Sequence, residues 1–241
     1  MKAAIVIPAR YGSSRFPGKP LVPIAGVSLI RRVYERAVTS RRAGAVFVAT
    51  DDARIIDHVR AFGGNVVAPE GDFVSGTDRI AAALAHLGGD FDQIVNVQGD
   101  EPLIDMNSVD AVIDVLQSEP VDMATLACPL ESDDEYQSRD VVKVVTDLRG
   151  NALYFSRAAI PHGGRELARR HIGLYGYQTA VLRKLASLAP SPLERAESLE
   201  QLRALQNGLT IRVLSSDKPH LGVDRPEDVA KVEQELARLD A

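Results

Sequence analysis

The feature that most constrains this chain is an alternation of almost continuous apolar runs with amphipathic segments. Four runs rich in β-branched residues occupy positions 3–7, 45–49, 65–68 and 93–98 of the 241-residue sequence. Runs of this kind suit parallel strands that are covered on both faces, and the segments between them have helical periodicity. The pattern therefore predicts an α/β fold built on a three-layer, Rossmann-like, mostly parallel sheet.

Three helices are predicted between these strands. The first begins after Ser28, a suitable N-cap, and continues to Gly44, while the next two cover residues 55–63 and 78–88. Each segment ends on glycine, the residue that most often follows a helix.

The middle of the chain has a different pattern, with closely spaced strands and only short helical pieces. We expect a smaller mixed-sheet subdomain over residues 120–180, within a single domain that covers residues 1–241. Its strands are expected at 121–128, 141–147, 151–157 and 172–179. Helical patterns near 193–207, a strand at 210–215 and a closing helix from Pro226 complete the chain.

Composition excludes several classes of protein. A content of 45% hydrophobic and 25% charged residues is ordinary for a globular chain. The one cysteine, Cys128, excludes an intramolecular disulfide and favours the cytoplasm. A net charge of -5 argues against a nucleic-acid partner. We expect neither a signal peptide nor a membrane span, because no apolar run is long enough.

The segment after the first apolar run is the first candidate for ligand binding, because open parallel sheets bind ligands beyond the carboxyl ends of their strands. It reads PARYGSSRFPGKPL from Pro8 onward. Arg10, Arg15 and Lys19 place three cations within ten residues, which suits a polyphosphate. The segment is not a Walker A loop, since five residues separate its two glycines and Pro20 replaces the metal-binding Ser or Thr.

Two aspartates are candidate metal ligands. Asp100 follows the run 93–98 in the sequence QGDEP, and Asp224 precedes the closing helix in VDRPED. A carboxylate at the end of a strand suits Mg²⁺ that also binds phosphate oxygens. Turn formation by Asp100 and helix capping by Asp224 are the alternatives. The polar loop SGTDR at 75–79 opens a helix and either caps it or offers N–H groups to a nucleotide.

These motifs together resemble the CMP-Kdo synthetases, the 3-deoxy-manno-octulosonate cytidylyltransferases. PARY with PGKPL is similar to the family's opening, QGDEP to its metal motif, and VDRPED to its Val-Asp-Thr-Pro-Glu-Asp signature with Arg225 in place of Thr. The family commonly has a histidine where this chain has Phe73. The resemblance covers nearly the whole chain and implies the nucleotide-diphospho-sugar transferase type of fold.

The resemblance also implies an activity: CTP and 3-deoxy-manno-octulosonate (Kdo) give CMP-Kdo and pyrophosphate, for lipopolysaccharide biosynthesis, with Mg²⁺ as cofactor. The anomeric hydroxyl is expected to attack the α-phosphorus in line, with charge neutralisation and positioning as the main contributions. The resembled enzymes are homodimers, and we expect the interface over residues 120–180.

The roles of individual residues follow from the same resemblance. Arg10, Lys19 and Asp100 are expected to be catalytic, with Asp100 and Asp224 as the metal ligands. The expected CTP site consists of Pro8, Ala9, Arg10, Gly12, Arg15, Lys19, Ser75, Gly76, Arg79, Gln98 and Asp100. The expected sugar-acid site consists of Gln98, Arg157, His171, Tyr175, Glu200 and Gln201. Taken alone, His171 would be a structural histidine and Tyr175 a core residue.

Other activities remain open on the sequence. A cytidylyltransferase for 8-amino-Kdo, sialic acid or a polyol phosphate would share the nucleotide motifs, although Arg157 with His171 favours a carboxylate-bearing sugar. A non-catalytic nucleotide-binding module is disfavoured by cations aimed at a leaving pyrophosphate. A glycosyltransferase usually has an Asp-x-Asp motif, which is not found near Asp100.

Overall fold

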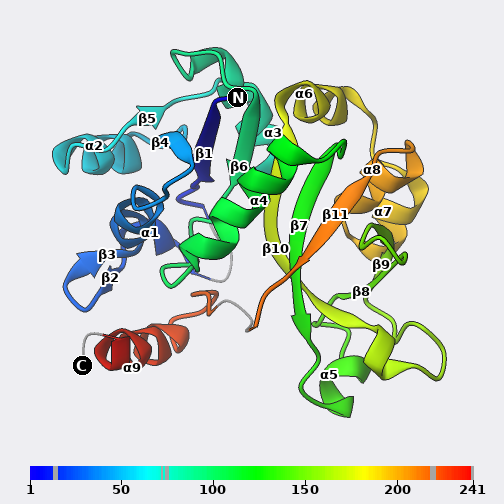
Figure 1. Ribbon diagram of the computed structural model, residues 1–241. Coiled ribbons are helices and arrows are strands. Elements are labelled where there is room, and N and C mark those ends of the chain that lie inside the picture. Colours follow the sequence, from blue (N-terminus) through cyan, green and yellow to red (C-terminus); the bar gives the residue numbers. More distant parts are fainter. Residues whose placement is uncertain (13–15, 72, 74–75, 218–220, 240–241) are drawn as a thin grey trace. The chain divides into compact units, whose positions relative to one another are not determined.

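The computed structural model describes residues 1–12, 16–71, 73, 76–217 and 221–239 (Figure 1). The chain forms two compact units. Unit 1 comprises Met1–Asp110 with His220–Ala241, and unit 2 comprises Ala111–Pro219. The predicted mixed-sheet region lies within unit 2. The single-domain organisation over 1–241 stays a prediction.

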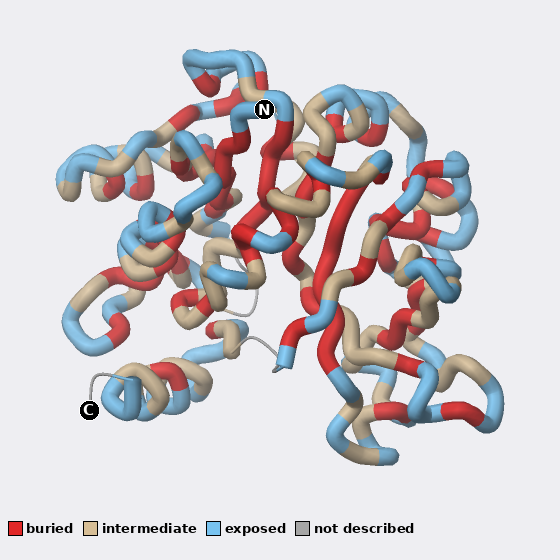
Figure 2. The backbone as a smooth tube through the Cα atoms, viewed as in Figure 1, coloured by how far each residue is buried: buried red, intermediate tan, exposed pale blue. Residues whose placement is uncertain are grey.

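Unit 1 is built on the predicted parallel sheet. β1 (Ala3–Pro8) lies between β4 (Ala43–Ala49) and β6 (Gln93–Asn96), and both pairings are parallel. The short β5 (Val66–Val67) extends the sheet beyond β4. β1 is almost wholly buried, as its red colour in Figure 2 shows. The α/β fold with a parallel sheet is confirmed, because continuous apolar runs have no solvent-facing side.

Helices and short segments connect these strands. Those of unit 1 are η1 (Lys19–Leu21), α1 (Leu29–Ala37), α2 (Ala53–Ala61), α3 (Gly76–Ala83), η2 (Leu84–His86) and α9 (Asp228–Leu239), with the small hairpin of β2 (Pro23–Ile24) and β3 (Val27–Ser28). α4 (Met106–Ser118), with 13 residues, crosses the boundary between the units. None of the helices described has the length and apolarity needed to traverse a bilayer.

Two helix boundaries differ from the sequence prediction. α1 ends at Ala37 rather than Gly44, because Gly44 lies within β4, the strand that pairs with β1. α9 begins at Asp228 rather than Pro226. The amide of Asp228 bonds to the carbonyl of Arg225 at 3.0 Å, so a tight turn precedes the α-helix.

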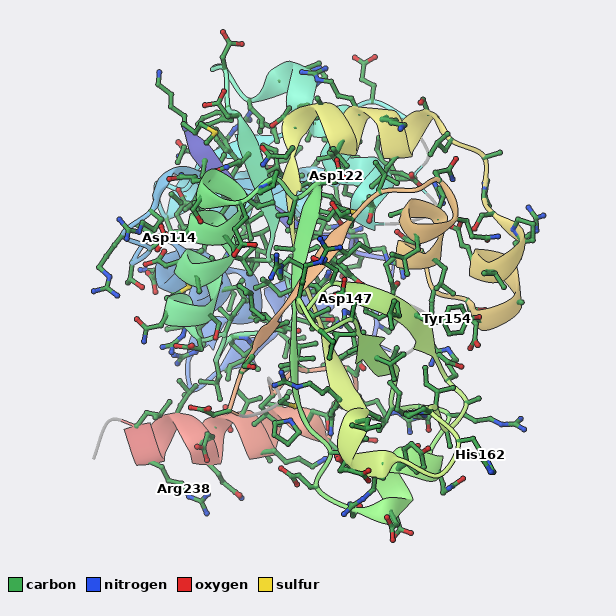
Figure 3. All side chains as sticks on the ribbon, turned by 45° about the vertical axis from the view of Figure 1, so that its right-hand side comes forward. Asp114, Asp122, Asp147, Tyr154, His162 and Arg238 are labelled. Atoms are coloured by element: carbon green, nitrogen blue, oxygen red, sulfur yellow. The ribbon has the colours of Figure 1, made fainter. Side chains whose placement is uncertain are left out.

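Unit 2 contains the expected mixed sheet. β7 (Met123–Pro129) lies between β11 (Ile211–Ser215), which is parallel to it, and β10 (Arg169–Gln178), which is antiparallel. β8 (Lys143–Thr146) pairs with β10 and with β9 (Ala152–Ser156). Asp147 forms the turn between β8 and β9, where its carboxylate accepts the amide of Asn151 at 2.8 Å (Figure 3). The remaining elements of this unit are α5 (Asp133–Gln137), η3 (Arg165–Leu167), α6 (Thr179–Ser187), α7 (Pro192–Glu197) and α8 (Gln201–Gln206).

The sequence analysis did not predict α4, although its signal is present. Val109, Val112, Ile113 and Leu116 are buried and repeat with helical spacing. Asp105 supplies the start, because its carboxylate accepts the amide of Ser108 at 2.9 Å. Amphipathic periodicity with an N-capping Asp would have identified this helix.

An irregularity in β10 determines which side chains share a face. Ile172 pairs with Leu126, but the next residue of β7, Thr125, pairs with Tyr175. The bulge therefore takes two residues out of the ladder. On a regular strand the backbone positions of residues four apart are separated by about 13 Å, and their side chains point the same way with a similar spacing. The ring centroids of His171 and Tyr175 are only 5.3 Å apart.

Gly176 of β10 tests the packing against α4. We expect Gly176→Ala to destabilise the protein by about 1–3 kcal/mol, the usual cost of overpacking a core. A Cβ atom there would lie 2.7 Å from Cδ1 of Leu116 and would also collide with Val112. The matched control is Gly173→Ala in the same strand, where a Cβ atom meets nothing within 4 Å. Urea unfolding of both variants is the measurement, and equal loss of stability would contradict this account.

Candidate active site

The loop after β1 is held in a turn that places Lys19. The amide of Gly18 donates to the carbonyl of Tyr11 at 3.0 Å, and Gly18 has a φ of 73°. A Cβ atom at Gly18 would also lie 3.2 Å from the Tyr11 ring. Both the backbone conformation and the close approach thus require glycine. Lys19 follows directly, at the start of η1, and Arg10 is exposed on the same loop.

The first turn of α2 supports this loop through a contact that sequence reasoning missed. The guanidinium of Arg54 lies over the Tyr11 ring, 3.2 Å from its centroid. Asp52 holds the guanidinium with two bonds, from Nε at 2.9 Å and from Nη2 at 2.7 Å. The bond to Arg54 lowers the pKa of Asp52. The Arg54 guanidinium, held by Asp52, therefore supports the loop at Tyr11.

Asp100 approaches this loop because the residue before it is glycine. A Cβ atom at Gly99 would lie 2.8 Å from the carbonyl oxygen of Pro8, so only glycine allows β6 to end this close to β1. The backbone of Asp100 is also bound by the segment before α9. Its carbonyl accepts the amide of Val223 at 2.8 Å. Three distant segments of unit 1 thus meet at one place.

The ammonium of Lys19 lies between the two candidate metal ligands. Its Nζ is 2.7 Å from Oδ2 of Asp100 and 3.7 Å from Oδ1 of Asp224. The Lys19 side chain is 15% exposed, whereas that of Asp224 is 59% exposed, so the cluster opens to solvent on one side. The carboxylate of Asp228 accepts the amides of Asp224 and Arg225 at 3.1 and 3.0 Å and fixes this segment. The structure therefore brings together three of the predicted residues.

The expected base-binding residues lie around the start of α3. Arg79 is 7% exposed, and its Nη1 donates to Oδ1 of Asp51 at 2.6 Å. Its guanidinium lies 4.9 Å from the centroid of Phe73, the residue that replaces the family's histidine. Gly76 lies against Pro8, since a Cβ atom there would be 3.5 Å from Cγ of Pro8.

Three other residues of the expected CTP site are Ala9, Gly12 and Gln98. Ala9 is buried, and its amide bonds to the carbonyl of Ala49 at 2.9 Å. Gly12 is exposed, and Gln98 follows β6 with its carbonyl accepting the amide of Glu101 at 3.3 Å. Arg15 and Ser75 lie outside the described residues.

In unit 2, aromatic rings form a row along one face of β10. The His171 ring lies 5.3 Å from that of Tyr175, which lies 6.0 Å from that of Tyr177. Phe155 of β9 contacts His171 edge-on at 5.0 Å. The bulge in β10 produces the contact between His171 and Tyr175. Two of the residues between them are left out of the pairing with β7, so the two rings lie closer together than on a regular strand.

Two buried polar atoms of unit 2 form no hydrogen bond of normal geometry with the described residues, although the Thr125 side chain lies close enough to one of them to lower the pKa of Tyr175. They are the hydroxyl of Tyr175 and Nε2 of Gln201, a residue only 8% exposed at the start of α8. Buried polar groups are nearly always paired in folded proteins, so unpaired ones in a site indicate a missing ligand or water. Glu200, the adjacent residue, is exposed.

Two titratable groups of this row, His171 and Tyr175, are neutral at physiological pH. Burial lowers the pKa of His171 to about 3 and raises the pKa of Tyr175 well above its usual range. Interactions with Tyr177 and with the negative charge of Glu200 raise the pKa of Tyr175 further, and a hydrogen bond with Thr125 opposes this rise. His171 is therefore an uncharged imidazole at physiological pH.

Arg157 is held by groups that the sequence analysis did not single out. Its Nε donates to the carbonyl of Glu197 at 3.0 Å, and its own amide donates to the Glu197 carboxylate at 2.9 Å. That carboxylate also accepts the hydroxyl of Tyr154, which Figure 3 places on β9, at 3.5 Å. Lys143 is fully buried and donates to three carbonyls at 2.7 Å each, that of Arg157 among them. The sequence contained a signal for this buried lysine, because Lys143 stands inside the apolar run VVKVV.

Comparison with known proteins agrees with this geometry. The chain is 52% identical to a 3-deoxy-manno-octulosonate cytidylyltransferase of Syntrophotalea carbinolica, over 99% of this chain and 100% of the relative. It is 44% identical to the protein of the same name from Geobacter metallireducens, over 99% of both chains.

Solved structures show the same relationship. A CMP:2-keto-3-deoxy-manno-octonic acid synthetase complexed with CTP has a TM-score of 0.93 and 40% identity, covering 99% of this chain and 100% of the other. A cytidylyltransferase from Leptospira borgpetersenii, at 20% identity and a TM-score of 0.67, shows the shared fold alone. The cytidylyltransferase family profile matches residues 4–211. This chain therefore belongs to the cytidylyltransferase family.

Proposed function

We propose that this chain transfers the cytidylyl group of CTP to Kdo and releases pyrophosphate, which supplies CMP-Kdo for lipopolysaccharide biosynthesis in the cytoplasm. The observation that carries the proposal is the convergence of Lys19, Asp100 and Asp224 beside the loop after β1. The relatives named for this reaction match the chain from end to end, and a neighbour of the same fold was solved with CTP.

Asp100 and Asp224 are suited to hold Mg²⁺ with the triphosphate. Their carboxylates face the same ammonium, so a cation between them is already favoured electrostatically. No group of three or more acidic, His or Cys side chains in the described part of the chain could bind a metal alone. Two carboxylates match Mg²⁺, which commonly keeps phosphate oxygens and waters as its other ligands. When bound, the ion would neutralise phosphate charge and lower the pKa of a bound hydroxyl.

The protein's own contribution in unit 1 is charge neutralisation and positioning. Arg10 and Lys19 carry the positive charges of the loop, and we assign them to the triphosphate, with Lys19 stabilising the leaving pyrophosphate. Gly76 and Arg79 at the start of α3 are assigned to the nucleoside, together with Gln98 and the backbone of Pro8 and Ala9. Arg79 is fixed by Asp51 before any ligand arrives, which lowers the entropic cost of binding.

Unit 2 contains four side chains proposed to bind the acceptor hydroxyls and one cation proposed to bind its carboxylate. Arg157 is assigned to the sugar carboxylate, because it is the cation of the predicted set and His171 is neutral. Two of its N–H groups donate to backbone carbonyls among the described residues, which fixes the direction of the guanidinium. His171, Tyr175, Glu200 and Gln201 are assigned to the hydroxyls.

We also propose that the enzyme acts as a homodimer through the region 120–180. Leu148, Leu153 and Leu167 in this region are 108%, 62% and 67% exposed, and they are three of the large apolar side chains that the described residues leave in water. A second copy of the chain would remove them from water.

Replacing Asp100 tests the nucleotide and metal assignment. We expect Asp100→Asn to lower kcat/KM by about a thousandfold, because several kcal/mol of electrostatic stabilisation is lost. The matched control is Asp57→Asn, which changes an exposed carboxylate on α2 of the same unit. Pyrophosphate release from CTP and Kdo is measured, with circular dichroism as the check on folding. A folded Asp100→Asn enzyme with the control's activity would rule out this assignment.

The acceptor is tested by a panel of sugar acids. Pyrophosphate release is compared for Kdo, 8-amino-Kdo and sialic acid, each at a series of concentrations with saturating CTP. We expect the largest kcat/KM for Kdo, because the relatives that match the chain from end to end are named for this sugar acid. A larger value for either rival would reassign the substrate, and no release with any of them would remove the catalytic proposal.

The pH dependence of stability tests the neutral state of His171. Its pKa in the folded protein, about 3, lies below the ordinary 6.5. The unfolded chain therefore binds a proton that the folded one does not, and the wild type loses stability as pH falls from about 6.5 toward 3. His171→Gln lacks this loss, so the difference in unfolding free energy between the two proteins should shift in favour of the variant over that range. A difference independent of pH would show that His171 titrates normally.

A further inference from the structure

Thr125 of β7 is fully buried and lies beside the Tyr175 hydroxyl, whose pKa it lowers by hydrogen bonding. The hydroxyl of Thr125 contacts three further groups. Its Oγ1 lies 2.8 Å from the carbonyl oxygen of Leu174, 3.3 Å from that of Ile172 and 3.0 Å from Nε2 of His171. All three belong to the irregular part of β10, directly across from Thr125 in the sheet. The hydroxyl thus joins the bulge to the imidazole.

Counting protons fixes the direction of these bonds. A threonine hydroxyl has one proton to donate, and carbonyl oxygens only accept. If the proton went to His171, the oxygen of Thr125 would face the Leu174 oxygen at 2.8 Å with no hydrogen between them, which is repulsive. The hydroxyl therefore donates to the carbonyls and accepts from His171. Because Nε2 carries the proton, Nδ1 of the neutral ring is an acceptor.

Other polar groups of unit 2 offer donors. Nε2 of Gln201 is a buried donor without a partner among the described residues, and the Tyr175 hydroxyl forms no hydrogen bond of normal geometry there, although Thr125 lies close enough to lower its pKa. Glu200 adds a negative charge close enough to raise the pKa of Tyr175. A set that contains both acceptors and donors matches a hydroxyl, which gives one hydrogen bond and receives others. A carboxylate only accepts and would be repelled by Nδ1 and Glu200.

We propose that Thr125 is a positioning and specificity residue, which holds His171 as the Nε2–H tautomer so that Nδ1 accepts a hydrogen bond from a hydroxyl of the sugar. His171 then excludes a carboxylate from its side of the site, and the acceptor's carboxylate belongs to Arg157. The choice of hydroxyl over carboxylate rests on the proposed function. The tautomer itself does not, because it follows from the contacts of Thr125 alone.

The tautomer is measured directly by two-bond ¹⁵N–¹H correlation spectra of the full-length protein labelled at histidine. The chain has five histidines, and His171→Gln identifies the signal of interest. We expect Nδ1 of His171 to have the chemical shift of an unprotonated nitrogen and Nε2 that of a protonated one, at neutral pH and without substrate. A protonated Nδ1 in the wild type would overturn the proposal.

Two substitutions test what Thr125 does for the reaction. Thr125→Val keeps the shape but removes the hydroxyl, and we expect the KM for the sugar to rise about tenfold, as for the loss of one neutral hydrogen bond. The KM for CTP should be unchanged, since the nucleotide is assigned to unit 1, and kcat should fall less than the sugar KM rises. Thr125→Ser keeps the hydroxyl and should restore both the tautomer and the sugar KM.

The outcomes separate this inference from the proposed function. If Thr125→Ser raises the sugar KM as much as Thr125→Val, packing rather than the hydroxyl matters and the inference fails, while turnover of Kdo still supports the activity. If the wild type uses no sugar acid, the proposed activity fails, and the spectra alone decide the tautomer. Should Thr125→Val not fold, the wild-type spectra and the Thr125→Ser kinetics still decide the question.

Discussion

The candidate site depends on one electrostatic arrangement, the ammonium of Lys19 between the carboxylates of Asp100 and Asp224. Two carboxylates this close would repel each other without a cation between them. Lys19 and Asp100 are 81 residues apart, and the sheet brings them together because β1 and β6 are parallel neighbours with their carboxyl ends on the same side. In the proposed reaction the bound nucleotide brings its own negative charge to this place, and Lys19 is already there to meet it.

Much of unit 1 could be predicted from the sequence because its determinants are contiguous. The strands are runs of apolar residues, and the loop from Pro8 carries its cations within one short segment. What could not be predicted depends on tertiary contacts. The end of α1 at Ala37 is set by the pairing of β4 with β1, which overrides a helical pattern that continues toward Gly44. The support of Tyr11 by Arg54 joins segments with no shared motif.

Unit 2 shows a different limit of sequence reasoning. His171 and Tyr175 were predicted as site residues from the family resemblance alone. No local sequence pattern indicated that their rings would be neighbours. Their proximity comes from a bulge that Gly173 and Leu174 form against β7, and alternation of polar and apolar residues does not reveal such a shift. Lys143 is the opposite case, because a lysine within an apolar run was visible and its three carbonyl partners explain it.

The two groups of candidate site residues hold their polar atoms by different physical means, and this has a consequence for selectivity. The cluster of Lys19, Asp100 and Asp224 pairs charges that are partly exposed, which suits a strongly charged triphosphate but discriminates little among ligands of equal charge. Unit 2 buries neutral donors and acceptors around His171, where a ligand lacking the matching hydroxyl would leave them unpaired. A buried polar group left without a partner loses more binding free energy than a partly exposed ion pair contributes. Discrimination between acceptors is therefore expected to arise in unit 2.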